Sequence, residues 1–315
     1  MEESVKLLYV CGAGRSGSTI LDRMLGQVEG FFSAGEIRVL WDRALAQHLL
    51  CGCGLPLDDC PVWGDIIRNS VGGDNSNGGD DVRNIRQSAR TLATPLILLP
   101  GGRKLLRSMT LRHVDRIAAV YKAIVKQTGC RVIVDSSKVP AYSYLLSQVP
   151  GIELYVVHLV RDPRAVAYSW QKSKSRPDMR KVTGAPSEMT RFGLVTSSLI
   201  WAMENIASEM LWQRSERPYL RLSYEEFATH PKAALDSIFR LLGETPATTP
   251  FVSDSEVKLS VNHTVAGNPD RMSTGLVKLR VDDEWRARLA PMNRRLVEVL
   301  TFPVLHRYGY SVNGA

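Results

Sequence analysis

The sequence lacks an apolar run of the roughly 20 residues that a membrane-spanning helix needs. Its first residues, MEESVKLLYV, are acidic and lead directly into a strand-like segment, unlike the basic and then apolar start of a secretory signal. We therefore expect a cytoplasmic protein that does not span the membrane.

Acidic and aromatic residues are both in short supply. The 40 Lys and Arg residues outnumber the 32 Asp and Glu residues, which leaves a net charge of +8, and aromatic residues make up 7% of the chain. Such a charge fits either a solvated basic surface or an anionic ligand such as a nucleotide. No Lys/Arg run is interleaved with aromatic residues, so we expect no nucleic-acid partner.

The chain has only five cysteines, and because it lacks a secretory signal we expect reduced thiols. Three of the five cysteines cluster in CGCGLPLDDCPVW, at Cys51, Cys53 and Cys60. Three thiols could hold zinc, but a fourth ligand is not obvious, and His48 is the nearest candidate. A turn-rich loop with free thiols and a local disulfide are the alternatives, and we expect no metal to be required.

Short apolar runs alternate with helical patterns along the chain. Buried strands are predicted at 5–11, 31–35, 130–135, 154–160 and 218–224, and the helices between them include 37–50, 140–148, 163–172, 190–213 and 231–243. This order predicts an α/β fold with a mostly parallel sheet covered by helices on both faces.

We expect one domain over 1–315, with helical insertions. Residues 40–128 are predicted to be a mostly helical insertion on the acceptor side, with a mobile polar loop at 72–81. Residues 246–280 are rich in Thr, Ser, Pro, Gly and Asn and predict a closing loop, and 282–301 predicts a final helix.

A glycine-rich loop follows the first predicted strand. Its sequence, GAGRSGST at 12–19, has the glycine spacing of a P-loop, but Ser18 stands where the lysine belongs. Backbone N–H groups and the start of the next helix would still favour a phosphate there. Without the lysine a magnesium triphosphate is disfavoured, and Arg15 could supply a bidentate cation.

This loop resembles the 5′-phosphosulfate loop, [K/R]-S-G-[T/S]-T, of the sulfotransferases that use 3′-phosphoadenylyl sulfate. The resemblance implies the P-loop sulfotransferase fold and a donor-binding role for five residues: Arg15, Ser16, Gly17, Ser18 and Thr19.

A second motif, RDPRAVAYS, begins at the end of the strand predicted at 154–160. Asp162 is a good N-cap and Pro163 suits the first helical position, so Arg161 should lie at the carboxyl edge of the sheet. The motif resembles the 3′-phosphate-binding segment of the same family, which implies that Arg161 and Ser169 bind that phosphate.

Two further segments resemble parts of this family. VNHTVAGNPDRMSTG at 261–275 is similar to a C-terminal segment of bacterial sulfotransferases that closes over the cofactor, which implies roles for Asn268 and Arg271, the latter facing the 3′-phosphate. RLSYEEF is similar to the family's Y-E-[D/E]-[L/F] segment, which makes Tyr224 a candidate cofactor contact or a structural residue.

Sulfuryl transfer needs a base for the acceptor hydroxyl and cations for the leaving phosphate. The helix after the glycine-rich loop runs about 16 Å away from the sheet edge, and a five-residue strand returns by about 16 Å, so Glu36 should lie beside the loop. Glu36 lies in a Gly-Glu-Ile-Arg segment. This segment is similar to, and one residue shorter than, the segment that carries the glutamate base in tyrosylprotein sulfotransferases. His48 and His263 are the alternative candidates for the base.

Lys138 resembles the lysine of this family that contacts the bridging oxygen of the donor. Arg15 would also stabilise the charge on that oxygen.

The resemblance implies a small-molecule hydroxyl acceptor. Four basic residues in the predicted lid make an acidic acceptor one alternative: Lys172, Lys174, Arg176 and Arg180. A P-loop kinase or nucleotide hydrolase, with Asp135 holding magnesium, is the competing enzyme. A nucleotide- or nucleic-acid-binding module is the non-enzymatic alternative.

Overall fold

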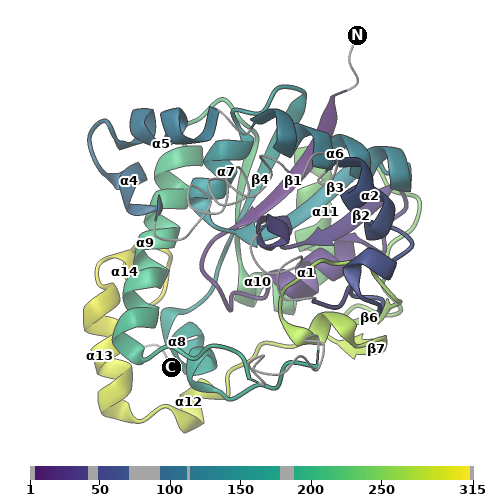
Figure 1. Cartoon of the computed structure of the whole chain (residues 1–315). Coiled ribbons are helices and arrows are strands. Elements are labelled where there is room, and N and C mark those ends of the chain that lie inside the picture. The colour runs from purple at the N-terminus through teal and green to yellow at the C-terminus, as the bar shows by residue number, and fades with distance from the viewer. Residues whose placement is uncertain (1–3, 42–48, 71–92, 112–113, 178–187, 313–315) are drawn as a thin grey trace.

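The computed structural model describes residues 4–41, 49–70, 93–111, 114–177 and 188–312. At its centre is a parallel sheet of five strands in the order β2-β3-β1-β4-β5 (Figure 1). The strands are β1 (Val5–Cys11), β2 (Phe31–Gly35), β3 (Val132–Lys138), β4 (Ile152–Val160) and β5 (Tyr219–Ser223). The predicted α/β class is therefore confirmed.

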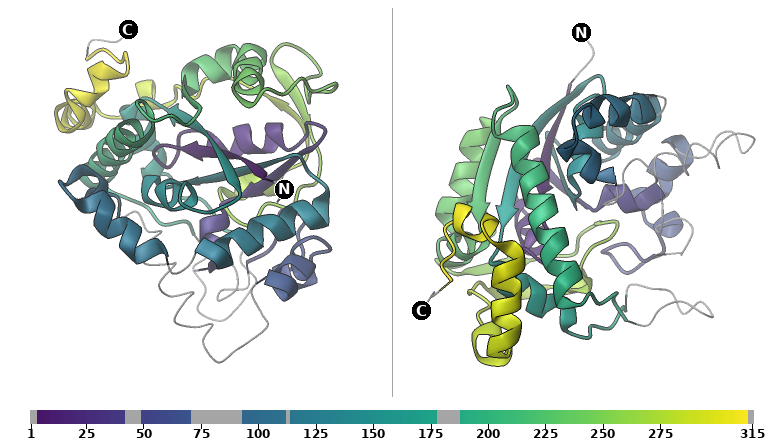
Figure 2. Two further views of the ribbon diagram at one scale, coloured as in Figure 1. Left: turned by 90° about the horizontal axis from the view of Figure 1, so that it is seen from above. Right: turned by 90° about the vertical axis from the view of Figure 1, so that its left-hand side faces the viewer.

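Helices cover both faces of this sheet because its strands are apolar on both faces. In β1, Leu7 and Tyr9 pack in one core cluster with residues of α6 (Val114–Thr128) and α7 (Pro140–Leu146). Leu8 packs in a second cluster with residues of α1 (Ser18–Leu25) and α11 (Pro231–Leu242). Figure 2 shows the sheet between these layers.

The strand order reverses direction around β1, because the chain passes from β1 to the β2 edge, returns through β3 and continues to β4 on the other side. In open α/β sheets, ligands bind outside the carboxyl ends of the strands at such a point. The segments that follow β1, β2, β3 and β4 therefore define the place to look for a site.

The remaining helices surround this frame. They are α2 (Trp63–Ser70), α4 (Pro95–Leu98), α5 (Gly102–Thr110), α8 (Pro163–Gln171), α9 (Leu194–Trp212), α10 (Tyr224–Thr229), α12 (Trp285–Arg288), α13 (Pro291–Thr301) and α14 (Val304–Arg307). Within the described ranges, no helix is long and apolar enough to cross a membrane.

Two sequence predictions were wrong in detail. Of the helix expected at 37–50, the residues Ile37–Trp41 form a 3-10 helix and Leu50 forms an isolated β-bridge with Pro56, while 42–48 lie outside the described residues. The expected helix at 282–301 breaks into α12 and α13, because the chain is extended at Leu289 and Ala290 and Pro291 starts a new helix.

The segment 246–280 is more regular than a loop. It contains the antiparallel strands β6 (Glu256–Leu259) and β7 (Gly275–Lys278), joined through a 3-10 helix, Pro269–Met272. The loop predicted at 72–81 lies outside the described residues.

Candidate functional site

The glycine-rich loop joins β1 to α1 with an unusual backbone. Gly12, Arg15 and Gly17 have φ of 124°, 69° and 90°. A Cβ on Gly12 would lie 2.4 Å from the Leu159 carbonyl oxygen, so only glycine fits against β4. Positive φ values are a feature of backbone nests, in which N–H groups face one concavity and bind an anion.

Arg15 lies over this loop. Its guanidinium stacks 4.8 Å from the ring centroid of Trp170 and its Nη2 lies 3.6 Å from the Met189 sulfur. Burial lowers the pKa of Arg15, with the charge of Glu36 acting in the opposite direction. The side chain is thus held by apolar and aromatic neighbours that leave its charge for a ligand.

Arg161 follows β4 and lies beside the same loop. Its Nη1 donates to the carbonyl oxygen of Arg15 at 3.0 Å, and its Nη2 pairs with the Asp282 carboxylate at 3.0 Å. Burial raises the pKa of Asp282, but the hydrogen bond and charge of Arg161 outweigh it, so that pKa is lowered overall. Asp282 is therefore an anionic partner of Arg161.

Tyr224 fixes the distance between loop and arginine. Its ring lies under the Arg161 guanidinium at 4.3 Å, and a Cβ on Gly17 would come within 2.6 Å of the same ring. Tyr224 starts α10, where the preceding Ser223 caps the helix by accepting from the N–H of Glu226.

Three buried polar atoms here have no hydrogen-bond partner within the part of the chain that the structure describes. They are Ser16 Oγ, Arg15 Nε and Arg161 Nε. Buried donors are normally paired, because an unpaired one costs about 1–3 kcal/mol. Their convergence on one loop is what an anionic ligand would satisfy.

Glu36 and Lys138 meet at the neighbouring strand ends. Lys138 Nζ donates to Glu36 Oε1 at 2.6 Å and to the Ser136 carbonyl oxygen at 2.9 Å, and both side chains are less than one-fifth exposed. Lys138 has φ of 70°, a sparsely populated conformation for a residue with a Cβ. The sheet thus brings together a carboxylate and an ammonium that are 102 residues apart in the sequence.

The other predicted donor residues occupy distinct places. Ser18 is buried at the start of α1, followed by the half-buried Thr19, and Ser169 is half-buried on α8. Asn268 caps the 3-10 helix Pro269–Met272 by accepting from the N–H of Asp270. Ser18 and Thr19 thus lie at the loop, and Ser169 precedes Trp170, whose ring packs against Gly14 of the loop. Asn268 lies in the closing segment, residues 261–275.

Arg271 is fully buried within the closing segment. Its guanidinium donates to the carbonyl oxygens of Thr264 at 2.9 Å and Leu50 at 2.7 Å. Its Cδ lies 3.8 Å from the point where a Cβ on Gly267 would stand, and Glu36 Oε1 lies 3.6 Å from that point. The guanidinium itself holds backbone carbonyls, so its predicted role toward the 3′-phosphate stays a prediction.

Two buried carboxyl groups, those of Asp22 and Asp135, lie behind the loop, and Asp22 was not predicted from the sequence. Burial raises the pKa of Asp22 to about 7 and that of Asp135 to about 6. Ser136 Oγ donates to Asp22, while Tyr121 and Ser137 donate to the two oxygens of Asp135. The only sequence signal for Asp22 is a charged residue at a core-facing helical position.

Basic residues of the predicted lid are partly neutralised. Lys172 pairs with Glu284, and Lys174 pairs with Asp270 of the closing segment at 2.5 Å. Arg180 lies outside the described residues.

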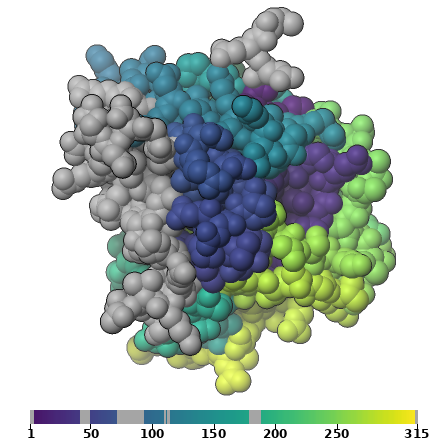
Figure 3. Space-filling view, turned by 45° about the vertical axis from the view of Figure 1, so that its right-hand side comes forward, coloured from purple at the N-terminus to yellow at the C-terminus, as the bar shows by residue number. Residues whose placement is uncertain are grey.

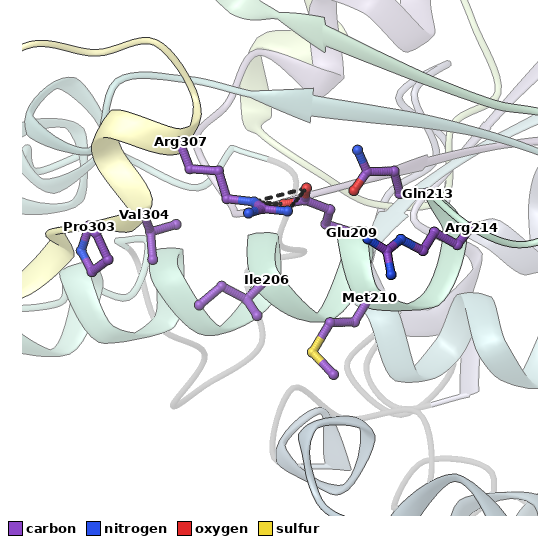
Figure 4. A pocket seen from close by; sticks show the side chains of 8 residues that line it. All are labelled: Ile206, Glu209, Met210, Gln213, Arg214, Pro303, Val304 and Arg307. Atoms are coloured by element: carbon purple, nitrogen blue, oxygen red, sulfur yellow. Dashed lines mark hydrogen bonds and ion pairs between the residues drawn. The ribbon is translucent and has the colours of Figure 1, made fainter.

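A surface cavity of about 640 Å³ lies elsewhere, between α9 and α14 (Figure 4). Its lining residues are Ile206, Glu209, Met210, Gln213, Arg214, Pro303, Val304 and Arg307. None of the predicted site residues lines it, and two of its lining residues, Arg307 and Glu209, form an ion pair at 2.7 Å. We therefore assign the site from the strand ends rather than from this cavity.

The cysteines at 51, 53 and 60 are free thiols that converge on His263. The reserve base His263 thus belongs to this cluster. His48, the fourth ligand suggested by sequence proximity, lies outside the described residues.

Comparison with known proteins identifies the family of this chain. Residues 7–269 match the family model described as sulfotransferase domain. Among solved structures, the sulfotransferase domain from the curacin biosynthetic pathway is 15% identical over 98% of this chain and 99% of that chain, with a TM-score of 0.51. The sulfotransferase domain of the Synechococcus PCC 7002 olefin synthase is 17% identical over 99% of this chain and 97% of that chain, with a TM-score of 0.49.

No curated protein matches the chain. At this identity the curacin-pathway domain supports the fold alone, and the family match carries the assignment. Because that match spans most of the chain, this protein belongs to the sulfotransferase domain family.

Proposed function

We propose that this sulfotransferase takes its sulfuryl group from 3′-phosphoadenylyl sulfate and transfers it to a hydroxyl of a small-molecule acceptor. The observation that carries the proposal is the meeting, at one sheet edge, of the glycine-rich loop, Arg161 and the Glu36–Lys138 pair. A cytoplasmic location stays a prediction from the sequence.

The donor would be held at its two phosphate-bearing ends. Residues 15–19 suit the 5′-phosphosulfate, since Ser16 Oγ and Arg15 Nε are buried without partners among the described residues. Arg161 and Ser169 suit the 3′-phosphate, and this phosphate would replace Asp282 as the anion beside Arg161. Asn268 and Arg271 belong to the segment that would close over the donor.

The transfer step assigns one role to each group at the strand ends. Glu36 takes the proton from the acceptor hydroxyl, whose oxygen forms a bond to sulfur. The bond from sulfur to the bridging oxygen breaks, and its electron pair stays on the departing phosphate. Lys138 and Arg15 stabilise that negative charge, as preorganised cations do at the leaving group in phosphoryl transfer.

Lys138 would therefore serve two anions in turn. Its ammonium is within 2.6 Å of Glu36, so it can orient the base and then move toward the leaving oxygen.

The acceptor is proposed to be a small alcohol or phenol rather than a strongly acidic molecule. Two of the lid lysines are already paired with Glu284 and Asp270, which reduces the local positive charge.

The kinase alternative needs Asp135 as a metal ligand, but this side chain is already engaged within the protein. Both oxygens of Asp135 accept hydrogen bonds from the protein, and the side chain is fully buried. Ser18 also replaces the P-loop lysine that a triphosphate needs.

Calorimetric titration tests the donor site. We expect adenosine 3′,5′-bisphosphate to bind without a metal and more tightly than ATP with magnesium. Arg161→Ala should weaken bisphosphate binding by at least about tenfold, since charge-assisted hydrogen bonds are worth about 1.5–3 kcal/mol. Arg161→Lys should restore only part of it, because lysine lacks the bidentate fork.

The matched control is Arg240→Ala, which removes an exposed arginine on α11 whose Nη2 donates to Ser237. It should leave bisphosphate affinity unchanged. Magnesium-dependent ATP binding that is tighter than bisphosphate binding and indifferent to Arg161 would refute the proposal.

A further inference from the structure

Three thiols and one imidazole meet where the insertion contacts the closing segment. Cys51, Cys53 and Cys60 come from the described part of the insertion, and His263 comes from the segment 261–275, about two hundred residues further along. Their sulfur and nitrogen ligand atoms all lie within 4.8 Å of one another. Figure 3 shows residues 49–70, in blue, lying against the yellow-green surface of the closing segment.

Four of the six spacings between these atoms are close to the edges of a metal-centred tetrahedron, and the other two are no longer than 4.8 Å. With Zn–S near 2.3 Å and Zn–N near 2.0–2.1 Å, tetrahedral geometry requires about 3.8 Å between two sulfurs and about 3.6 Å between sulfur and nitrogen. The Cys60 sulfur lies 3.9 Å from Cys53 and 3.5 Å from Cys51. His263 Nδ1 lies 3.3 Å from the Cys60 sulfur and 3.7 Å from the Cys51 sulfur.

The backbone holds the ligands in place. A tight turn closes between Cys51 and Cys53, in which the N–H of Gly54 donates to the Cys51 carbonyl oxygen at 2.8 Å and Gly54 has φ of 88°. The N–H of Trp63, at the start of α2, donates to the Cys60 sulfur at 3.5 Å, and such a helix start favours a thiolate.

The two segments are also fitted to each other. The N–H of Gly52 donates to the Thr264 carbonyl oxygen at 2.9 Å, and a Cβ on Gly52 would lie 2.1 Å from Asn262 Oδ1. Trp63 Nε1 donates to the His263 carbonyl oxygen. The backbone that carries the cysteines therefore packs directly against the backbone on both sides of His263.

We propose that Cys51, Cys53, Cys60 and His263 bind one structural zinc ion. Three thiolates and one imidazole form a closed four-ligand set, which is typical of structural rather than catalytic zinc. A disulfide would use two sulfurs and give no reason for the third sulfur and the imidazole to converge on them.

The ion would fix the closing segment to the rest of the site. Beyond His263, the N–H of Val265 donates to the carbonyl oxygen of Ala34 at the end of β2 at 2.9 Å. Gly267 then passes beside Glu36 and Thr19. A cross-link at His263 therefore limits the freedom of the chain that lies over the proposed base, and it does so whether or not the donor assignment holds.

Metal analysis of the full chain, purified without a polyhistidine tag or a chelator, tests the site. We expect about one tightly bound zinc per chain. Cobalt substitution should give the sulfur-to-cobalt charge-transfer and tetrahedral d–d bands of a thiolate site. Zinc removal should speed amide hydrogen exchange at 49–56 and 261–272 and leave α11 unchanged.

Cys53→Ser is the informative variant because Cys53 is only half-buried. It should lower zinc affinity by more than about 100-fold, because changes outside the ligand set already cost about 10–100-fold. Cys130→Ser is the control, since Cys130 is a buried free thiol outside the cluster.

Several outcomes would overturn the site. Equal zinc in Cys53→Ser and wild type would mean adventitious metal. A reduced wild-type protein that holds no zinc and gives no cobalt–thiolate bands, or a protein mass showing a disulfide among these cysteines, would exclude it.

Discussion

Replacing Glu36 by glutamine separates its proposed role as the base from its role as an ion-pair partner. The side chain keeps its shape and can still accept a hydrogen bond from Lys138 Nζ, now 2.6 Å from Oε1. Exchanging a charged for a neutral hydrogen bond should cost about 1 kcal/mol of stability. The amide cannot take the acceptor's proton, so turnover should fall about 10²–10⁴-fold, which is about 3–5 kcal/mol in activation free energy.

The chain contains a matched control pair. Lys6 and Glu244 form an ion pair at 2.8 Å with side chains 25% and 13% exposed, against 2.6 Å and 14% and 18% for Lys138 and Glu36. Lys6 lies near the start of β1, at the opposite edge of the sheet from the proposed site. Glu244 also lies 3.6 Å from Arg131 Nε, so Glu244→Gln should lose at least as much stability as Glu36→Gln and leave turnover unchanged.

The assay is formation of adenosine 3′,5′-bisphosphate from the donor, followed by chromatography, with and without a mixture of hydroxyl acceptors. Bisphosphate affinity should stay the same or rise in Glu36→Gln, because Lys138 is freed from a carboxylate. Turnover within about threefold of wild type, where a lost general base costs at least about 10²-fold, would refute the role of Glu36. An equal loss in Glu244→Gln would instead point to general destabilisation.

Two further predictions follow from the fold. Gly17→Ala should destabilise the protein by about 1–3 kcal/mol in urea titration and abolish bisphosphate binding, because Gly17 has φ of 90° and its Cβ would contact the Tyr224 ring at 2.6 Å. For His158, burial lowers the pKa from 6.5 to about 4, so the unfolded chain binds more protons between these values and His158 lowers stability as pH falls through that range. His158→Gln should flatten this dependence in urea titrations from pH 7 to 4, and an unchanged slope would contradict it.

The parallel sheet was predictable because each of its strands has a recognisable local sequence pattern. Strands buried on both faces read as continuous apolar runs, and glycines or a Pro mark where each ends. The errors lie where tertiary contacts outweigh local pattern. Strands β6 and β7 have four residues each, EVKL and GLVK, with only two of the residues Val and Leu in each, so no long run of apolar residues marks them.

The candidate site was predictable to the extent that strand ends meet at one edge. This rule alone places Glu36, Lys138 and Arg161 near the glycine-rich loop, and the structure has them there. The partner of Arg161 was not predictable, because Asp282 is 121 residues away in the sequence and no local pattern distinguishes it from other acidic residues.

The fourth residue of the cysteine–histidine cluster was also not predictable from the local sequence. Sequence proximity favours His48, because a chain can close a short loop at little entropic cost. His263 reaches the cluster only because β2 and the closing segment lie together, with the N–H of Val265 bonded to the Ala34 carbonyl oxygen. His263 is distant from the cysteines in the sequence, so the cluster joins two separate segments of the chain. These segments must move apart before the cluster can open, and the cluster therefore stabilises both of them.

Three cations around the proposed site already have an anion from the protein, in contrast to Arg15, whose charge is left for a ligand. Arg161 holds Asp282, Lys138 holds Glu36 and Lys174 holds Asp270. An anion that binds one of these three cations must displace its carboxylate, so its net gain is smaller than its direct contacts suggest. Asp282 is the most readily displaced, since 42% of its side chain is exposed and can return to water. The 3′-phosphate end of the proposed donor should therefore bind at lower cost than the end beside Glu36, where the released carboxylate is needed for chemistry.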